Sequence, residues 1–176
     1  GNLGSTSLRG DIESALGEVI ERELGRLAFE FPNSHVVKTV ELARFAARNL
    51  VREERSSVLS ACAELRELPG VTLDSLPHWL GLAELFLTAK GTRRLQLNKN
   101  QGFPATDEGR AAKARLKAIG LDPQVEARLQ ALRSLPPTRF GEAQWDMLSA
   151  LMLLLPVAVG QLRLVFQKEG RVDFTE

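Results

Sequence analysis

The sequence predicts an all-α protein, a multi-helix bundle with one short extended or hairpin segment near residues 90–104. Apolar residues recur at steps of three and four along most of the chain, which is the spacing of one face of an α-helix. Breaks such as Pro69-Gly70 and Pro136-Pro137 divide this pattern into separate helices. Between Thr92 and Asn98 the pattern instead alternates, which is typical of extended backbone.

The length of 176 residues suits one domain with a sizeable hydrophobic core. Residues 1–10 (GNLGSTSLRG) are small and polar, so we expect a flexible linker or a cloning remnant there. We expect residues 11–176 to form a single helical domain.

Four helices are expected in the first half of the chain, each begun by a capping residue. The second should end in the charged stretch 52–55, and the other three at proline or glycine. The third should bury a stripe that contains Leu59, Cys62, Leu65 and Leu68. The expected starts, in order, are Asp11, Ser34, Ser56 or Ser57, and Asp74 or Ser75, and the first helix should end at Phe31-Pro32.

Three helices are expected in the second half, after a loop that Phe103 anchors in the core. The first is a basic helix over 107–119, and Asp122 should cap the next one at Pro123. The last helix carries apolar residues from Trp145 to Phe166 on several faces, so we expect it to be central and covered on several sides. Pro156 should kink it.

Positive charge is concentrated in one part of a nearly neutral chain. Lysine and arginine number 23 against 22 acidic residues, yet the stretch 86–106 holds four basic residues and no acidic one. Basic side chains bind nucleic-acid phosphates by charge neutralisation, but solubilising surface charge explains the stretch equally well. The candidate DNA-binding residues are Lys90, Arg93, Arg94 and Lys99, with Arg110, Lys113 and Lys117 on one face of the following helix.

The residue pattern does not indicate catalytic activity. The sequence contains no GxxxxGK[ST] phosphate loop, no G-x-S-x-G elbow and no HExxH pair. Cys62 is expected in the core and His78 at a partly buried polar contact, because no base, nucleophile or carboxylate cluster accompanies either. We therefore expect no catalytic residue, no metal site and no cofactor in this chain.

The single cysteine excludes an internal disulfide and suits a reducing cytoplasm. The N-terminal residues do not resemble a signal peptide. The most apolar run, 147–159, contains Pro156 and is shorter than a bilayer span, so we expect no membrane segment.

Residues 87–104 (LTAKGTRRLQLNKNQGFP) resemble a stretch of UvrD/Rep-type superfamily I DNA helicases of the exonuclease V beta-subunit kind, the RecB/AddA-like group. Further signals extend the resemblance over about residues 74–176. They are Pro77, Trp79 and Leu87-Thr88 upstream, and Leu135-Pro136-Pro137, Gln144-Trp145, Leu154-Leu155-Pro156, Leu162-Arg163-Leu164-Val165-Phe166 and Val172-Asp173-Phe174-Thr175-Glu176 downstream.

This resemblance implies the helical insert subdomain, called 1B, of the first motor domain of an ATP-dependent DNA helicase/exonuclease. It implies a parent that acts in double-strand-break repair and recombination and binds ATP and Mg²⁺ through motifs outside this chain. The implied partners are DNA, the remainder of the motor and a partner subunit of a helicase–nuclease complex. The alternative is a protein-interaction module that packs on the motor core or a partner subunit, which an exposed apolar patch would favour.

Overall fold

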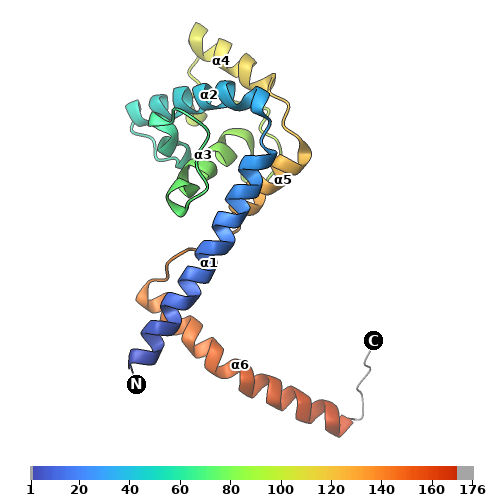
Figure 1. The fold of residues 1–176 in the computed structure, drawn as a ribbon. Coiled ribbons are helices and arrows are strands. Elements are labelled where there is room, and N and C mark those ends of the chain that lie inside the picture. The colour runs from blue at the N-terminus through green and yellow to red at the C-terminus, as the bar shows by residue number, and fades with distance from the viewer. Residues whose placement is uncertain (1, 170–176) are drawn as a thin grey trace. The chain divides into compact units, whose positions relative to one another are not determined.

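The computed structural model describes residues 2–169, and side chains from residue 8 to residue 167 (Figure 1). All regular structure in this part of the chain is helical, which confirms the all-α prediction. The motif at 172–176 lies outside the described residues. The elements are α1 (Asn2–Glu30), α2 (Asn33–Arg52), η1 (Val58–Glu64), η2 (Leu73–Ser75), α3 (Leu76–Phe86), η3 (Lys99–Gln101), α4 (Asp107–Lys117), α5 (Pro123–Leu132) and α6 (Glu142–Glu169).

The chain divides into two compact units, and the expected single domain over 11–176 stays a prediction. Unit 1 comprises Gly1–Ser14 and Pro137–Glu176, and unit 2 comprises Ala15–Pro136. Residues 2–10 also differ from the expected flexible linker, because they are the first part of α1. Asp11 therefore lies within a helix and does not cap one.

Contacts across unit 1 explain why α1 begins so early despite its glycines and serines. Arg9 donates a 2.7 Å hydrogen bond to Glu142, and its guanidinium lies 6.0 Å from the centroid of the Trp145 ring. The backbone N–H of Phe140 donates a 3.0 Å hydrogen bond to Glu13, and this bond, followed by Arg9, lowers the pKa of the Glu13 carboxyl. Tertiary contacts of this kind stabilise helical turns that have weak intrinsic propensity.

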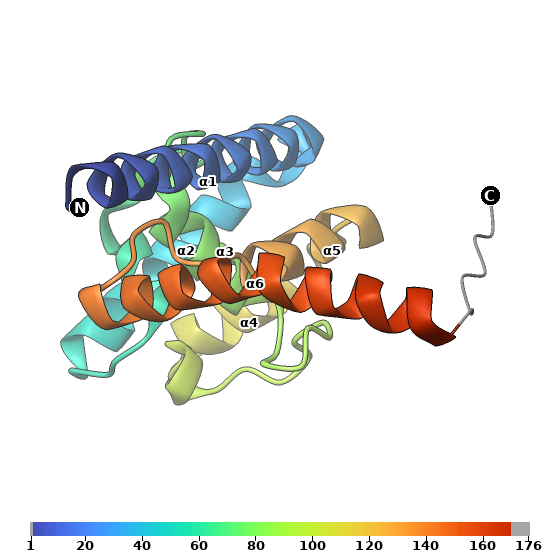
Figure 2. The same cartoon turned by 90° about the horizontal axis from the view of Figure 1, so that it is seen from below.

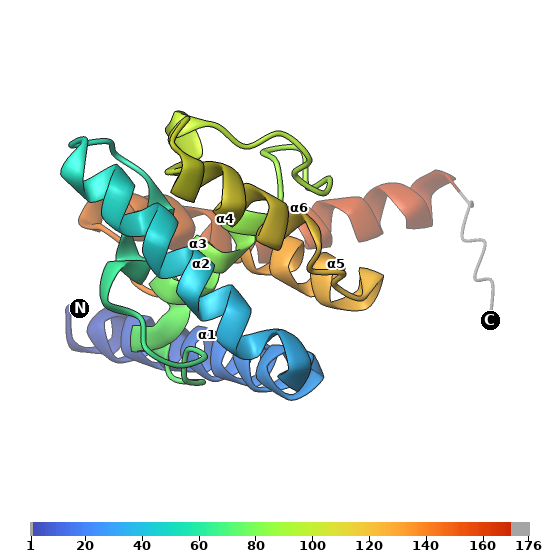
Figure 3. The same ribbon diagram turned by 90° about the horizontal axis from the view of Figure 1, so that it is seen from above.

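Unit 2 has its core around α3, which contacts α2, η1 and α5 (Figures 2 and 3). Trp79 is fully buried, packs edge-on against Phe31 and donates a 2.8 Å hydrogen bond to the carbonyl of Gly70. Phe103 is fully buried as well, which confirms that it anchors its loop. The predicted break at Phe31-Pro32 is also confirmed, because α1 ends at Glu30.

The third expected helix is a 3₁₀ helix, η1, and not an α-helix. Its buried side chains, Leu59 and Cys62, and the buried Leu65 that directly follows it recur at steps of three, which is the repeat of a 3₁₀ helix. Ser57 caps it as predicted by accepting a 3.1 Å hydrogen bond from the backbone N–H of Leu59. Close packing on Gly81 holds it in place, since a Cβ there would lie 2.7 Å from the sulfur of Cys62.

The extended segment near 90–104 is reduced to one antiparallel bridge, between Leu87 and Arg93. The N–H of Thr88 donates a 2.8 Å hydrogen bond to the carbonyl of Thr92, which closes a tight turn. Gly91 within that turn has a φ of 78°, a conformation that favours glycine. The bridge does not extend further, so the segment is a turn followed by a loop that contains the short 3₁₀ helix η3.

The prediction that the last helix is central and covered is wrong. α6 runs without interruption through Pro156, and its large apolar side chains are exposed, with Leu153 at 77% and Phe166 at 44%. A helix that is apolar on all faces indicates burial, yet the other described residues of unit 1 leave most of α6 uncovered. The length argument against a membrane segment also fails, because residues 142–167 are long and apolar enough to cross one.

Candidate nucleic-acid interface

Arg93 is held by contacts within unit 2. Its Nη1 atom lies 2.6 Å from a carboxylate oxygen of Glu126 on α5, and its Nη2 donates to the carbonyl of Ile119. The guanidinium also lies 5.0 Å from the centroid of the Phe86 ring, a cation–π distance. Arg93 therefore joins the loop to α3 and α5, and its charge is neutralised locally.

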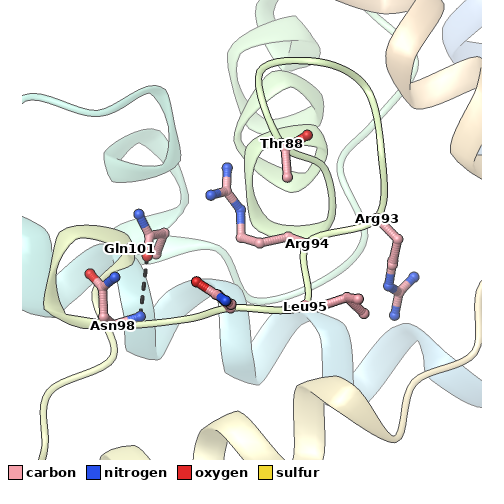
Figure 4. Close-up of a pocket in the computed structure, with 7 residues that line it drawn as sticks. Thr88, Arg93, Arg94, Leu95, Asn98 and Gln101 are labelled. Carbon is pink, nitrogen blue, oxygen red and sulfur yellow. Dashed lines mark hydrogen bonds between the residues drawn. The ribbon is translucent and has the colours of Figure 1, made fainter.

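Arg94 is also engaged internally, at the end of α3. Its Nε donates a 3.0 Å hydrogen bond to the carbonyl of Glu84 and its Nη2 a 2.7 Å bond to the carbonyl of Leu87. The last carbonyls of a helix lack intrahelical partners and carry partial negative charge, so a guanidinium there acts as a cap. Burial lowers the pKa of Arg94 from its ordinary value. Figure 4 shows the side chains of Arg93 and Arg94 leaving the segment in different directions.

The other candidate residues are more accessible than these two arginines. Lys90, Lys99 and Lys117 are exposed and Lys113 is half-buried, and none of the four forms an ion pair within the described residues. Arg110 is exposed and pairs with Asp107 on the same helix, α4. The predicted site therefore divides into two structural arginines and a set of solvent-facing cations.

A polar depression of about 400 Å³ lies beside the segment (Figure 4). Arg94, Gln96 and Asn98 contribute to its lining. Its floor is ordered by a capping box in which Gln101 Oε1 accepts a 3.1 Å hydrogen bond from the backbone N–H of Asn98. Arg93 also lines the depression, and both arginines are already hydrogen-bonded internally, so the depression offers mainly side-chain amides for hydrogen bonding.

A second basic surface lies between α2 and α4, and the sequence analysis missed it. It is a groove of about 440 Å³ whose lining includes four arginines together with Phe45. The signal was present in the sequence, because three of these arginines recur at i, i+4 and i+8. It was overlooked because acidic residues are interspersed nearby, so the stretch does not stand out by composition. The arginines are Arg44, Arg48 and Arg52 on α2 and Arg115 on α4.

Cys62 and His78 take no part in either surface. Cys62 is fully buried, as predicted, and burial together with the charge of Glu84 raises the pKa of its thiol to about 12. A thiol in that state is inert as a nucleophile at neutral pH. His78 is half-buried, and its backbone carbonyl lies 3.5 Å from the sulfur of Cys62. Among the described residues no three histidine, cysteine or acidic side chains cluster as a metal site would require.

Comparisons of the chain with models of protein families, with curated proteins and with solved structures found no match. The resemblance of residues 74–176 to the helicase group stays a prediction.

Proposed function

We propose that this chain is a non-catalytic helical subdomain of an ATP-dependent DNA helicase/exonuclease of the exonuclease V beta-subunit kind, acting in double-strand-break repair and recombination. The observation that carries the proposal is the acid-free stretch 86–106, which exposes Lys90 and Lys99 without an ion-pair partner in the described part of the chain. ATP and Mg²⁺ would be bound by the remainder of the motor. This subdomain would supply a contact to the phosphates of DNA.

Within this proposal the seven candidate residues have two roles. Arg93 and Arg94 stabilise the segment through Glu126 and the end of α3. The cations that remain for DNA are Lys90, Lys99, Arg110, Lys113 and Lys117. Each phosphate that a cation neutralises releases a counterion, so binding should weaken steeply as salt rises.

Titration of the 176-residue chain with fluorescent DNA at two salt concentrations tests the proposal. We expect weak binding without sequence preference that declines with salt, and loss of most of it in the variant Lys90→Glu/Lys99→Glu. The control is Arg22→Glu/Arg163→Glu, which changes the net charge equally at exposed positions on α1 and α6. Absence of binding at low salt, or binding that salt does not weaken, would reject DNA contact by charge.

A second candidate function, the protein-interaction module, is favoured by the exposed apolar surface of α6. Soluble monomers rarely expose continuous apolar surface of this kind without a partner to cover it. We propose that the motor core or a partner subunit covers α6 in the cytoplasm. The variant Leu153→Glu/Leu155→Glu should lose that partner while DNA titration is unchanged.

Charge placement on α6 supports a protein cover over a lipid one. Arg163 lies seventeen positions after Asp146, and at 1.5 Å per residue the helix rises about 26 Å between them. The hydrocarbon core of a bilayer is about 30 Å thick, so one charge would have to enter it or reach to its surface. Flotation with liposomes checks this argument: co-flotation of the chain that survives high salt and carbonate would place α6 in lipid.

A further inference from the structure

The groove between α2 and α4 has the geometry of a site for a chain of anions. Arg44, Arg48 and Arg52 lie on one face of α2, and successive members are separated by about 6 Å along the helix axis. Arg115 on α4 lines the same groove. A ligand that lies along α2 would meet guanidinium groups at regular intervals, as a repeating polyanion requires.

Two of these arginines have no carboxylate partner among the described residues. Arg44 makes only a long hydrogen bond, 3.5 Å, to the carbonyl of Leu65, and Arg52 donates to the side-chain oxygen of Asn49. A guanidinium has five N–H donors, so most donors of both remain for a ligand. These two groups are the strongest candidates for direct phosphate contact.

The other two arginines form ion pairs that a ligand can displace. Arg48 contacts Glu64 at 3.1 Å, and more than half of each side chain is exposed. Arg115 pairs with Glu41, which is also well exposed. Exposed pairs contribute about 0–1 kcal/mol, so exchanging a carboxylate for a phosphate at these positions costs little.

We propose that the arginine groove binds the phosphate backbone of a single nucleic-acid strand. Guanidinium groups bind phosphate through paired hydrogen bonds. Phe45 lines the groove among the arginines, and an aromatic ring beside a row of cations is the combination that single-strand binding surfaces use to stack bases. This inference rests on the proposed contact with DNA and adds α2 and α4 to the contact that the loop at 86–106 makes.

The test removes the two arginines that lack carboxylate partners. We expect Arg44→Ala/Arg52→Ala to weaken binding of a short fluorescent single-stranded DNA about tenfold or more at low salt. The salt slope, which is the decrease of log K with the logarithm of the salt concentration, should fall by about 1.4, the value for two contacts to a single strand. The control Arg22→Ala/Arg163→Ala should bind as the unmodified chain does. Circular dichroism checks that each variant is folded.

A second variant makes the groove more positive and should strengthen binding. Glu41 and Glu108 also line it, and their carboxylates compete with a bound phosphate. Glu41→Gln/Glu108→Gln should therefore tighten single-strand binding and increase the salt slope. This variant removes no arginine, so it keeps the inference testable if Arg44→Ala/Arg52→Ala fails to fold.

The outcomes separate this inference from the proposed function. If DNA binding persists unchanged in Arg44→Ala/Arg52→Ala but is lost in Lys90→Ala/Lys99→Ala, the groove is not the site and the proposed function stands. If the unmodified chain binds no DNA at low salt, both are overturned. If polyglutamate competes as well as DNA does at equal charge, the groove serves an acidic protein segment and the nucleic-acid inference is wrong.

Discussion

The Nδ2 atom of Asn49 on α2 donates a 2.9 Å hydrogen bond to the backbone carbonyl of Gly102, which follows η3. Asn49 is buried, with 8% of its surface exposed. The rings of Phe45 on α2 and Phe103 in the loop also lie 6.0 Å apart. The loop that carries Lys90 and Lys99 is therefore fastened to the helix that carries three arginines of the groove.

Replacement of Asn49 by alanine should destabilise unit 2. The carbonyl of Gly102 would lose its side-chain donor in a buried position, and a buried polar group without a partner costs about 1–3 kcal/mol. We expect the urea midpoint of unfolding to fall by a corresponding amount. An unchanged midpoint would mean that water replaces the amide.

Gly102→Ala should be more damaging than Gly120→Ala. Gly102 has a φ of 79°, and a Cβ there would overlap the backbone of Ala46 on α2. Strain of this kind costs about 1–3 kcal/mol before the steric overlap is counted. Gly120 has open space around it, so its substitution should change the free energy of unfolding by less than about 0.5 kcal/mol. Equal effects of the two substitutions in urea titrations would contradict the close approach of the loop to α2.

Arg94→Ala should act on stability more than on DNA affinity. The carbonyls of Glu84 and Leu87 would lose a charged donor at the end of α3, and hydrogen bonds to charged groups contribute about 1.5–3 kcal/mol. Lys90→Ala is the matched control, because it removes the same charge from an exposed position of the same loop. A larger loss of DNA affinity in folded Arg94→Ala than in Lys90→Ala would return Arg94 to the set of DNA contacts.

Stability should fall at alkaline pH because of Cys62. Its pKa is raised from 9.0 to about 12 in the folded chain, so its stabilising effect is complete below pH 9 and is lost as pH rises from 9 toward 12. Over that range the unfolded thiol ionises while the folded thiol keeps its proton. Urea titrations at several pH values should show a weaker decline in Cys62→Ala, in which this group is absent. The same decline in both proteins would assign the effect to other groups.

Structural features that depend on residues close in the sequence could be predicted from it. Ser57 caps η1 and Asp122 caps α5 because each cap acts on a backbone N–H two residues away. The break at Phe31-Pro32 is equally local. In each case one residue type at one position dictates the backbone conformation.

Structural features that depend on residues far apart in the chain could not be predicted from the sequence. Arg93 is neutralised by Glu126, 33 positions away, and nothing in the acid-free stretch indicates that partner. The early start of α1 depends on Phe140 and Glu142 in the same way. For α6 the composition correctly indicated an apolar helix, but nothing local indicated that unit 1 leaves its apolar side chains exposed.

The carboxylate of Glu13 accepts a hydrogen bond from the backbone N–H of Phe140, so the chain leaves unit 1 and re-enters it at neighbouring points. All of unit 2 is an insertion between those two points. An insertion whose two ends lie side by side can be exchanged, shortened or enlarged during evolution while unit 1 keeps its geometry.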